Sequence, residues 1–341
     1  MKTMKHIVTL ISAVLFASAV SAGEIGVSGS TSATITTGSS DGTTAGKSDT
    51  GRTLAVANDI NFDASGSVDE LGWTWKWQTQ LDAGAIDDTR LEITTGIGTI
   101  GLYGTEGGLN FKHGGSQNAI AFGSQIGSAG GIVDPADIGG QNNIQWHSAA
   151  DLLPYSTSIK LGYGMNGSAT SEPGDSPMST GHQTKGYSAQ ISFVPVDGAS
   201  IGASYYEIDS NVSYSGGAVQ DNQNAAYYGS YKFANGIGLS LTKAYNVPAS
   251  NSTVATYNLY ETDSYSIGYV TGPWSVSAGR EESHRNLTTD ADEYDVEIDI
   301  FAAAYTIGGA TLEAAYKTIE NASYVQNADQ TELHLGLSLA F

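Results

Sequence analysis

The last ten residues, "ELHLGLSLAF" (Glu332 to Phe341), alternate strictly between two kinds of side chain. Leucine occupies every second position from Leu333 to Leu339 and Phe341 ends the run, whereas the residues between them are polar or small. A period of two is typical of a β-strand with one apolar and one polar face. Left exposed to water, such a strand would be an aggregation hazard. The stretch therefore predicts a strand whose apolar face has a permanent apolar neighbour.

The same alternation recurs along the chain, and no convincing helical periodicity interrupts it. "LGWTWKWQTQL" (71–81) and "YSTSIKLGYGM" (155–165) both place large apolar residues on one face and polar or small ones on the other. Short Gly- and Pro-containing links such as "VTGPW" (270–274) alternate with longer polar connections, which indicates an antiparallel up-and-down arrangement. The sequence thus predicts an all-β chain.

About sixteen strands are expected, an even number as in bacterial membrane barrels. They fall at residues 25–37, 52–63, 71–82, 90–95, 99–105, 142–148, 155–166, 186–194, 199–209, 224–233, 237–247, 261–270, 274–284, 293–306, 310–320 and 331–341. The longest connection, 106–141, lies between the fifth and sixth strands, and loops of this length are usually functional. The fourth and fifth strands look too short to cross a membrane alone, so that side would be covered by neighbouring subunits.

The N-terminus and the composition narrow the location. Residues 1–22 combine two lysines, an apolar run and a small-residue cleavage site, the pattern of a cleaved signal peptide, which leaves 23–341 as a single domain. The chain has no cysteine, 14% charged residues and a formal net charge of −21. This charge repels nucleic acid and favours cations as partners.

The polar face of the strands is mostly Ser, Thr, Gly, Gln and Asn, and tyrosines gather near the strand ends of the apolar face. In a soluble sandwich the apolar face would be an interior and the other face would be charged. Aromatic residues at both ends of an apolar band are instead the girdles of a transmembrane β-barrel. With about sixteen strands such a barrel is wide enough to hold water.

Together, the signal peptide, the alternating strands, the long connection and the terminal Phe341 after "LHLGLSL" resemble a Gram-negative trimeric outer-membrane porin. The resemblance implies a homotrimer in outer-membrane lipid, a terminal aromatic read by the assembly machinery, and passage of small hydrophilic solutes and cations. It also implies that loop 106–141 folds into the barrel and constricts the pore. "DPADIGGQNN" (134–143) is similar to the family's loop tip, with Ala136 inserted.

The resemblance further implies a constriction with basic wall residues opposite acidic loop residues. Lys76 and Arg90 point into the lumen by strand parity, and Asp134 and Asp137 on the loop, with Glu106 at its root, would supply the opposite charge.

A second acidic group comes from "YDVEIDIF" (294–301). If Val296, Ile298 and Ile300 face lipid, the three residues Asp295, Glu297 and Asp299 point inward. Carboxylates at every second residue are ~7 Å apart along a strand and would attract cations. A solvated face with no special role would look the same, but as a set they favour a cation-preferring pore.

Other motifs fail on context. "GIGTIG" (96–101) matches a dinucleotide fingerprint but is not followed by a helix. The histidines have no metal-ligand spacing, and the acidic stretch near Asp290 lacks the glycine and glutamate of a calcium loop. No catalytic motif is present, so we expect no enzyme activity, no metal and no cofactor.

The leading hypothesis is therefore a water-filled channel for passive diffusion. A substrate-selective outer-membrane channel is the alternative within the same class. A secreted or surface-attached all-β adhesin or structural protein shares the alternation and the acidity, and it would be extracted without detergent.

Overall fold

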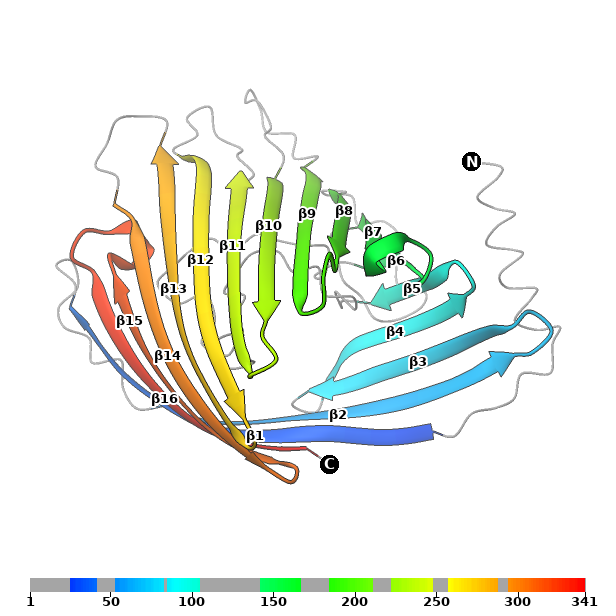
Figure 1. The fold of residues 1–341 in the computed structure, drawn as a ribbon, viewed down its shortest axis with the longest axis horizontal. Coiled ribbons are helices and arrows are strands. Elements are labelled where there is room, and N and C mark those ends of the chain that lie inside the picture. Colours follow the sequence, from blue (N-terminus) through cyan, green and yellow to red (C-terminus); the bar gives the residue numbers. More distant parts are fainter. Residues whose placement is uncertain are drawn as a thin grey trace.

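A computed structural model describes residues 25–41, 53–82, 85–104, 142–166, 184–210, 222–247, 257–287 and 294–340. They form sixteen strands in one closed antiparallel barrel, in which each strand pairs with its neighbours in the sequence (Figure 1). The strands are β1 (Ile25–Asp41), β2 (Thr53–Val68), β3 (Trp73–Asp82), β4 (Ala85–Thr95), β5 (Gly98–Gly104), β6 (Asn142–Ser148), β7 (Ser158–Asn166), β8 (Thr184–Phe193), β9 (Ala199–Ser210), β10 (Asn222–Lys232), β11 (Ile237–Val247), β12 (Tyr257–Thr271), β13 (Trp274–Leu287), β14 (Val296–Ile307), β15 (Ala310–Glu320) and β16 (Asp329–Ala340).

The predicted fold is confirmed, and each predicted strand overlaps one observed strand. One detail is wrong: β4 begins at Ala85 and has 11 residues, so it is long enough to cross a membrane. β5 is short, with 7 residues. Apart from the strands, the described residues contain two single 3-10 turns, η4 (Pro154–Ser156) and η5 (Ala322–Tyr324). No helix among the described residues has the length and apolar character to cross a membrane.

The last strand closes the ring. β16 pairs with β1 over twelve residue pairs, from Ser30 opposite Ala340 to Asp41 opposite Asp329. The hydroxyl of Thr36 and Nδ1 of His334 are hydrogen-bonded across this seam at 3.3 Å. The strand predicted from the opening stretch thus has a partner on both sides, β15 and β1.

The two faces of the sheet differ over most of the ring. One face is mostly polar and is occluded: the exposed fractions of Asn143, Asn224 and Ser283 are 2%, 1% and 0%. The other carries exposed apolar residues, among them Leu335 at 45% and Ile35 at 45%, which lie opposite each other across the seam. Because the concave side of a barrel is the occluded one, the polar face is the lumen and the apolar face is the outer wall.

Aromatic residues mark both borders of the outer apolar band. At the end of the barrel with the short turns, Trp274 packs against Tyr305 with ring centroids 4.6 Å apart, and Tyr231 lies 4.6 Å from Phe233. Towards the end with the long connections, Tyr163 lies 5.4 Å from Tyr187. These rows are the interfacial girdles that a membrane barrel requires, because indole and phenol rings have one apolar and one polar end.

The short turns depend on glycine where the backbone folds back tightly. Gly236, between β10 and β11, has φ of 92°, and a Cβ there would lie 2.2 Å from the carbonyl oxygen of Val270. Any other residue would displace the neighbouring strand. The turn thereby fixes the register of β10, β11 and β12.

Candidate channel lining

The lumen face is built from rows of side chains that the strand register brings together. Amides and hydroxyls dominate the wall formed by β6 to β13. The Nδ2 group of Asn246 donates to Oδ1 of Asn224, at 2.5 Å, and Nε2 of Gln145 donates to Oδ1 of Asn143, at 2.7 Å. Because amides and hydroxyls are polar but uncharged, this wall is hydrophilic with few charges. Many of these groups are hydrogen-bonded to one another.

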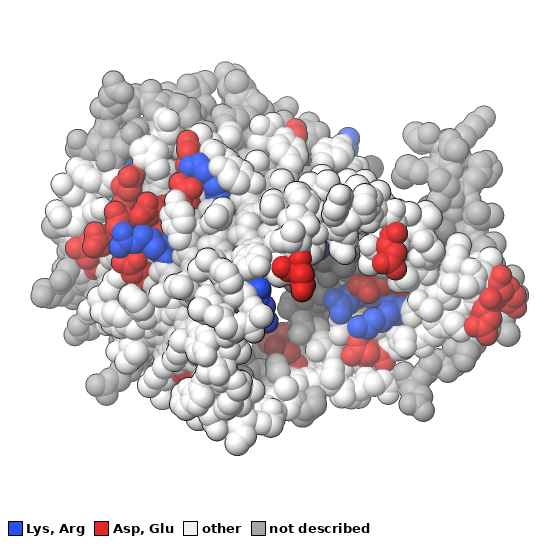
Figure 2. Space-filling view, in the orientation of Figure 1, with Lys and Arg blue, Asp and Glu red and all other residues white. Residues whose placement is uncertain are grey.

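Charges gather on the wall formed by β2, β3 and β4. Nζ of Lys76 lies 3.9 Å from Oδ1 of Asp63, and the same carboxylate accepts a hydrogen bond of 2.9 Å from Nε2 of Gln78. Figure 2 shows basic and acidic side chains side by side in a hollow over β3 and β4. Lys76 therefore lies on the lumen face, but a carboxylate of its own wall already balances its charge.

Arg90 lies on the same wall, one strand further. Its Nε is 3.8 Å from Oε1 of Glu92, and both side chains are 19% exposed. Glu92 also accepts a hydrogen bond of 3.2 Å from the phenol of Tyr103 on β5. The structure thus brings Lys76 and Arg90 to adjacent strands, each beside a carboxylate that the sequence analysis did not single out.

The long loop that was predicted to face these residues lies outside the described residues. This applies to loop 106–141 as a whole, to Glu106, Asp134 and Asp137, and also to the terminal Phe341. Their roles stay predictions.

A further charged cluster lies on the lumen face of the closing strands. Nζ of Lys317, whose side chain is 2% exposed, is 2.8 Å from Oε2 of Glu332. On the next row, Nε2 of His334 lies 3.5 Å from Oε1 of Glu313. Gly336 leaves the space for this carboxylate, because a Cβ there would be 2.3 Å from Oε1 of Glu313. The alternation of the terminal strand already indicated that Glu332 and His334 share the polar face. It did not indicate their partners on β15, Lys317 and Glu313.

The prediction that Asp295, Glu297 and Asp299 point into the lumen is wrong. Asp299 is on the same face as Phe301, which is 58% exposed on the outer wall, and the register places Phe301 opposite Tyr316. The exposed fractions of Val296, Ile298 and Ile300 are only 0%, 3% and 5%, so these three point inward. Parity failed because β14 is apolar on its lumen face too, where residues 322–324 cover it.

The three carboxylates belong instead to a charged cluster on the outer wall, near the end with the long connections. Figure 2 shows it over the upper ends of β12 to β15, above a nearly uncharged surface. The outer-wall cluster consists of Lys243, Glu261, Asp263, Arg280, Glu282, His284, Asp295, Glu297 and Asp299. Its carboxylates outnumber its basic residues, so the cluster has a net negative charge.

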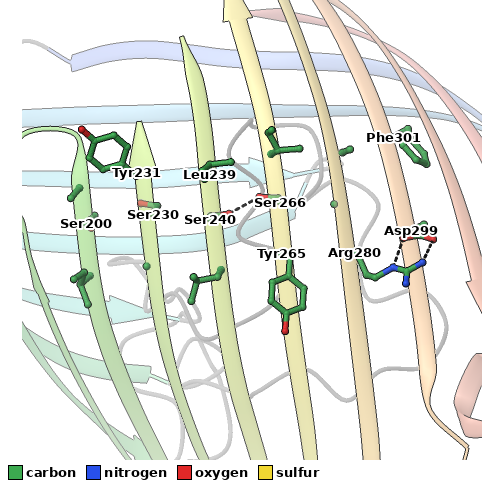
Figure 3. A pocket seen from close by; sticks show the side chains of 17 residues that line it. Ser200, Ser230, Tyr231, Leu239, Ser240, Tyr265, Ser266, Arg280, Asp299 and Phe301 are labelled. Carbon is green, nitrogen blue, oxygen red and sulfur yellow. Dashed lines mark hydrogen bonds and ion pairs between the residues drawn. The ribbon is translucent and has the colours of Figure 1, made fainter. Parts of the chain in front are cut away.

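Below this cluster lies a shallow apolar groove of about 710 Å³. In Figure 3, Tyr231, Leu239 and Phe301 surround it, and the Arg280–Asp299 pair lies at its border. Small residues, Gly229 and Ala278, form its floor. The groove belongs to the outer apolar band, which ends at the first row of ion pairs.

No group of three or more His, Cys, Asp and Glu side chains within the described ranges is arranged to hold a metal ion. The ion pairs and hydrogen bonds on the lumen face join side chains of neighbouring strands or side chains two residues apart on one strand.

No protein-family model matches the chain, and no curated protein sequence is significantly similar to it. Several solved structures, however, are similar to it in fold. A loop L8 deletion mutant of OmpT, an outer membrane protein of Vibrio cholerae, is 14% identical with a TM-score of 0.61, over 94% of this chain and 99% of that one. OmpF of Salmonella typhi, in complex with daunomycin, is 14% identical with a TM-score of 0.65, over 92% and 97%.

A mutant porin of Rhodopseudomonas blastica is 15% identical with a TM-score of 0.54, over 93% of this chain and 100% of that chain. At such identities the likeness establishes the fold and nothing finer. The predicted resemblance is confirmed at this level: the chain is a closed sixteen-stranded barrel with the fold of the outer-membrane porins.

Proposed function

We propose that this chain is a porin of a Gram-negative outer membrane, which forms a water-filled channel for passive diffusion of small hydrophilic solutes and ions and has no enzyme activity. One observation carries the proposal: the ring is closed, with its polar face inward and its apolar face outward between aromatic girdles. In a soluble protein the apolar face would be inside. In lipid, a closed ring satisfies every strand's backbone and leaves a polar passage.

The test is reconstitution of the detergent-purified protein. In planar bilayers we expect stepwise conductance, and in swelling assays with sugar-loaded liposomes a permeation rate that falls with solute size and does not saturate. Absence of conductance would refute the proposal. Block of the current at saturating concentrations of one solute would favour the substrate-selective channel instead, and purification without detergent would favour a secreted protein.

A preference for cations remains part of the proposal, but on different residues from those first expected. Three of the lumen bases, Lys76, Arg90 and Lys317, lie 3.9, 3.8 and 2.8 Å from wall carboxylates, so the charge of each is balanced. The acidic outer-wall cluster adds a negative potential near the mouth. We expect a modest cation preference, read from the reversal potential in a salt gradient.

A homotrimer is proposed on the exposed apolar surface of the first strands. On β1 and β2 the outward residues Ile25, Leu54 and Val56 are 72%, 72% and 70% exposed. The outward row of β2 runs from Leu54 to Ala64 and is apolar except for Asn58. Neighbouring subunits would cover this surface. Mass measurement of the native particle with and without Leu54→Lys and Val56→Lys tests it.

A further inference from the structure

The connection between β15 and β16 does not extend away from the barrel but turns back into it. Residues 321–328 contain the turn η5, which contacts β14. Figure 1 shows this segment curling back beside the end of β14 that lies near the long connections. Within it, Ala322 and Tyr324 are 3% and 4% exposed.

These two side chains complete a small apolar core on the lumen side of the wall. Their partners are inward-pointing residues of the neighbouring strands: Tyr260, Val296, Ile298, Ile300 and Ile319. In an open passage these side chains would face water, at a cost of ~1.5–3 kcal/mol for each large one. The connection removes them from water, which explains why an apolar inner face is tolerated here.

Tyr324 anchors the connection to β12 and β13. Its hydroxyl is hydrogen-bonded to Oγ of Ser283, at 2.7 Å, and its ring lies 5.5 Å from the ring of Tyr260 between centroids. The guanidinium carbon of Arg285 lies 5.0 Å from the Tyr324 ring centroid, within range of a cation–π contact. The anchor therefore combines apolar packing, a hydrogen bond and an electrostatic contact.

Hydrogen bonds from its ends hold the connection in shape. Nδ2 of Asn321 donates to the carbonyl of Asp295 at 3.0 Å, and the backbone N–H of Asn321 donates to Oδ1 of Asp329 at 3.2 Å. The N–H of Asn327 donates to Oδ1 of Asn321 at 3.0 Å. Asn321 has φ of 52°, a conformation that asparagine adopts more readily than most residues. These bonds tie the connection to the residue before β14, to β16 and to itself.

We propose that residues 321–328, which we call the mouth strut, narrow the passage at the end with the long connections and set a size limit for solutes there, with Tyr324 as the residue that holds them in place. The inference rests on the proposed channel function. It adds a specificity determinant on the β13 to β15 side, apart from the charged wall of β2 to β4.

The first test is the single-channel conductance of Tyr324→Ala. We expect it to rise above that of the unchanged protein, with more frequent transitions between levels, and larger sugars should enter liposomes faster. Tyr324→Phe keeps the ring and loses the bond to Ser283, so its conductance should stay near normal. Tyr316→Ala, which removes an aromatic ring from the outer wall, is the matched control and should leave conductance unchanged.

The second test leaves the packing of Tyr324 unchanged. The chain has no cysteine, so one introduced thiol is the sole reactive site. Ser323→Cys, on the exposed side of the strut, should react with a bulky membrane-impermeant thiol reagent and lose conductance. Thr318→Cys, on the outer wall opposite Asp299, should not change.

The outcomes separate the two proposals. An inactive unchanged protein would refute the channel itself. A conducting protein whose current is unaffected both by Tyr324→Ala and by the reagent on Ser323→Cys would overturn the mouth strut alone. If Tyr324→Ala does not assemble, the thiol experiment decides.

Discussion

Arg280 and Asp299 form a two-pronged ion pair on the outside of the barrel. Nε and Nη2 of the guanidinium donate to the two carboxylate oxygens at 2.8 and 2.6 Å, across the register of β13 and β14. Glu282 and Glu297 flank the pair: Oε1 of Glu282 and Oε2 of Glu297 lie 3.7 and 3.6 Å from Nη1 of Arg280. The pair is the first charged row beyond the apolar band, so it marks where the outer wall leaves the hydrocarbon.

Because this pair faces outward, Asp299→Asn should change ion selectivity much less than a substitution on the lumen face does. It should lower the temperature at which the barrel unfolds in detergent, since Arg280 would lose its bidentate partner at a membrane border. The measurements are the reversal potential in a salt gradient and the heat-dependent shift in gel mobility. A change of selectivity comparable to that of a lumen substitution would contradict the outward orientation.

Asp63→Asn, in contrast, should change the ion selectivity of the channel. It removes the carboxylate beside Lys76 on the lumen face, so the lysine presents an unbalanced positive charge to passing ions. The reversal potential should shift towards anions, more strongly at low salt, where screening is weaker. Asp69→Asn, in the turn after β2, is the matched control at a distance from the lumen wall. Equal potentials for the two variants would contradict the assignment of Asp63 to the channel lining.

Glu332→Gln should destabilise the barrel. It leaves Lys317, with a side chain 2% exposed, without its ion-pair partner at 2.8 Å. Breaking a fully buried pair costs ~3–5 kcal/mol, and we expect the lower end because the Glu332 side chain is 29% exposed. Urea unfolding of the folded barrel in detergent measures the loss. Glu320→Gln, on the outer face of the neighbouring strand, should stay close to the unchanged protein.

Gly336→Ala should also destabilise, by ~1–3 kcal/mol, through crowding. The new methyl group would lie 2.3 Å from Oε1 of Glu313, whose side chain is only 9% exposed and is in contact with His334. Adding Glu313→Ala removes the obstacle and should recover part of the loss. If the double variant is no more stable than the single one, the glycine is not required by this close approach.

Strand positions were predictable because most strands have a polar inner face and an apolar outer face. The sequence of such a strand alternates between polar and apolar residues. β11 and β15 were located to the residue for this reason. Lys76 and Arg90 were placed on the lumen face because their strands have a clear polar row. The partner Asp63 was missed, since which residues of two strands lie near each other depends on register, and no local pattern states it. Glu92 lies two residues from Arg90 on the same strand, so alternation alone already placed it on the lumen face.

β14 shows where alternation stops being informative. With Val296 on one face and Phe301 on the other, hydrophobicity alone cannot say which side is the lumen. The two faces differ because Tyr324 packs on only one of them, the face with Val296. Tyr324 belongs to a connection more than twenty residues further along the chain. A contact between distant segments is a tertiary fact, and it overrode a sound local rule.

The seam between β1 and β16 also governs how such a chain can reach its folded state. Thr36 and His334 are 298 positions apart in the sequence, yet the ring cannot close before their strands meet. Until then two unpaired strand edges stay open to other chains, and folds that depend on such distant pairings form slowly. A chain of this topology therefore gains from protection of its open strand edges until the seam between β1 and β16 has formed.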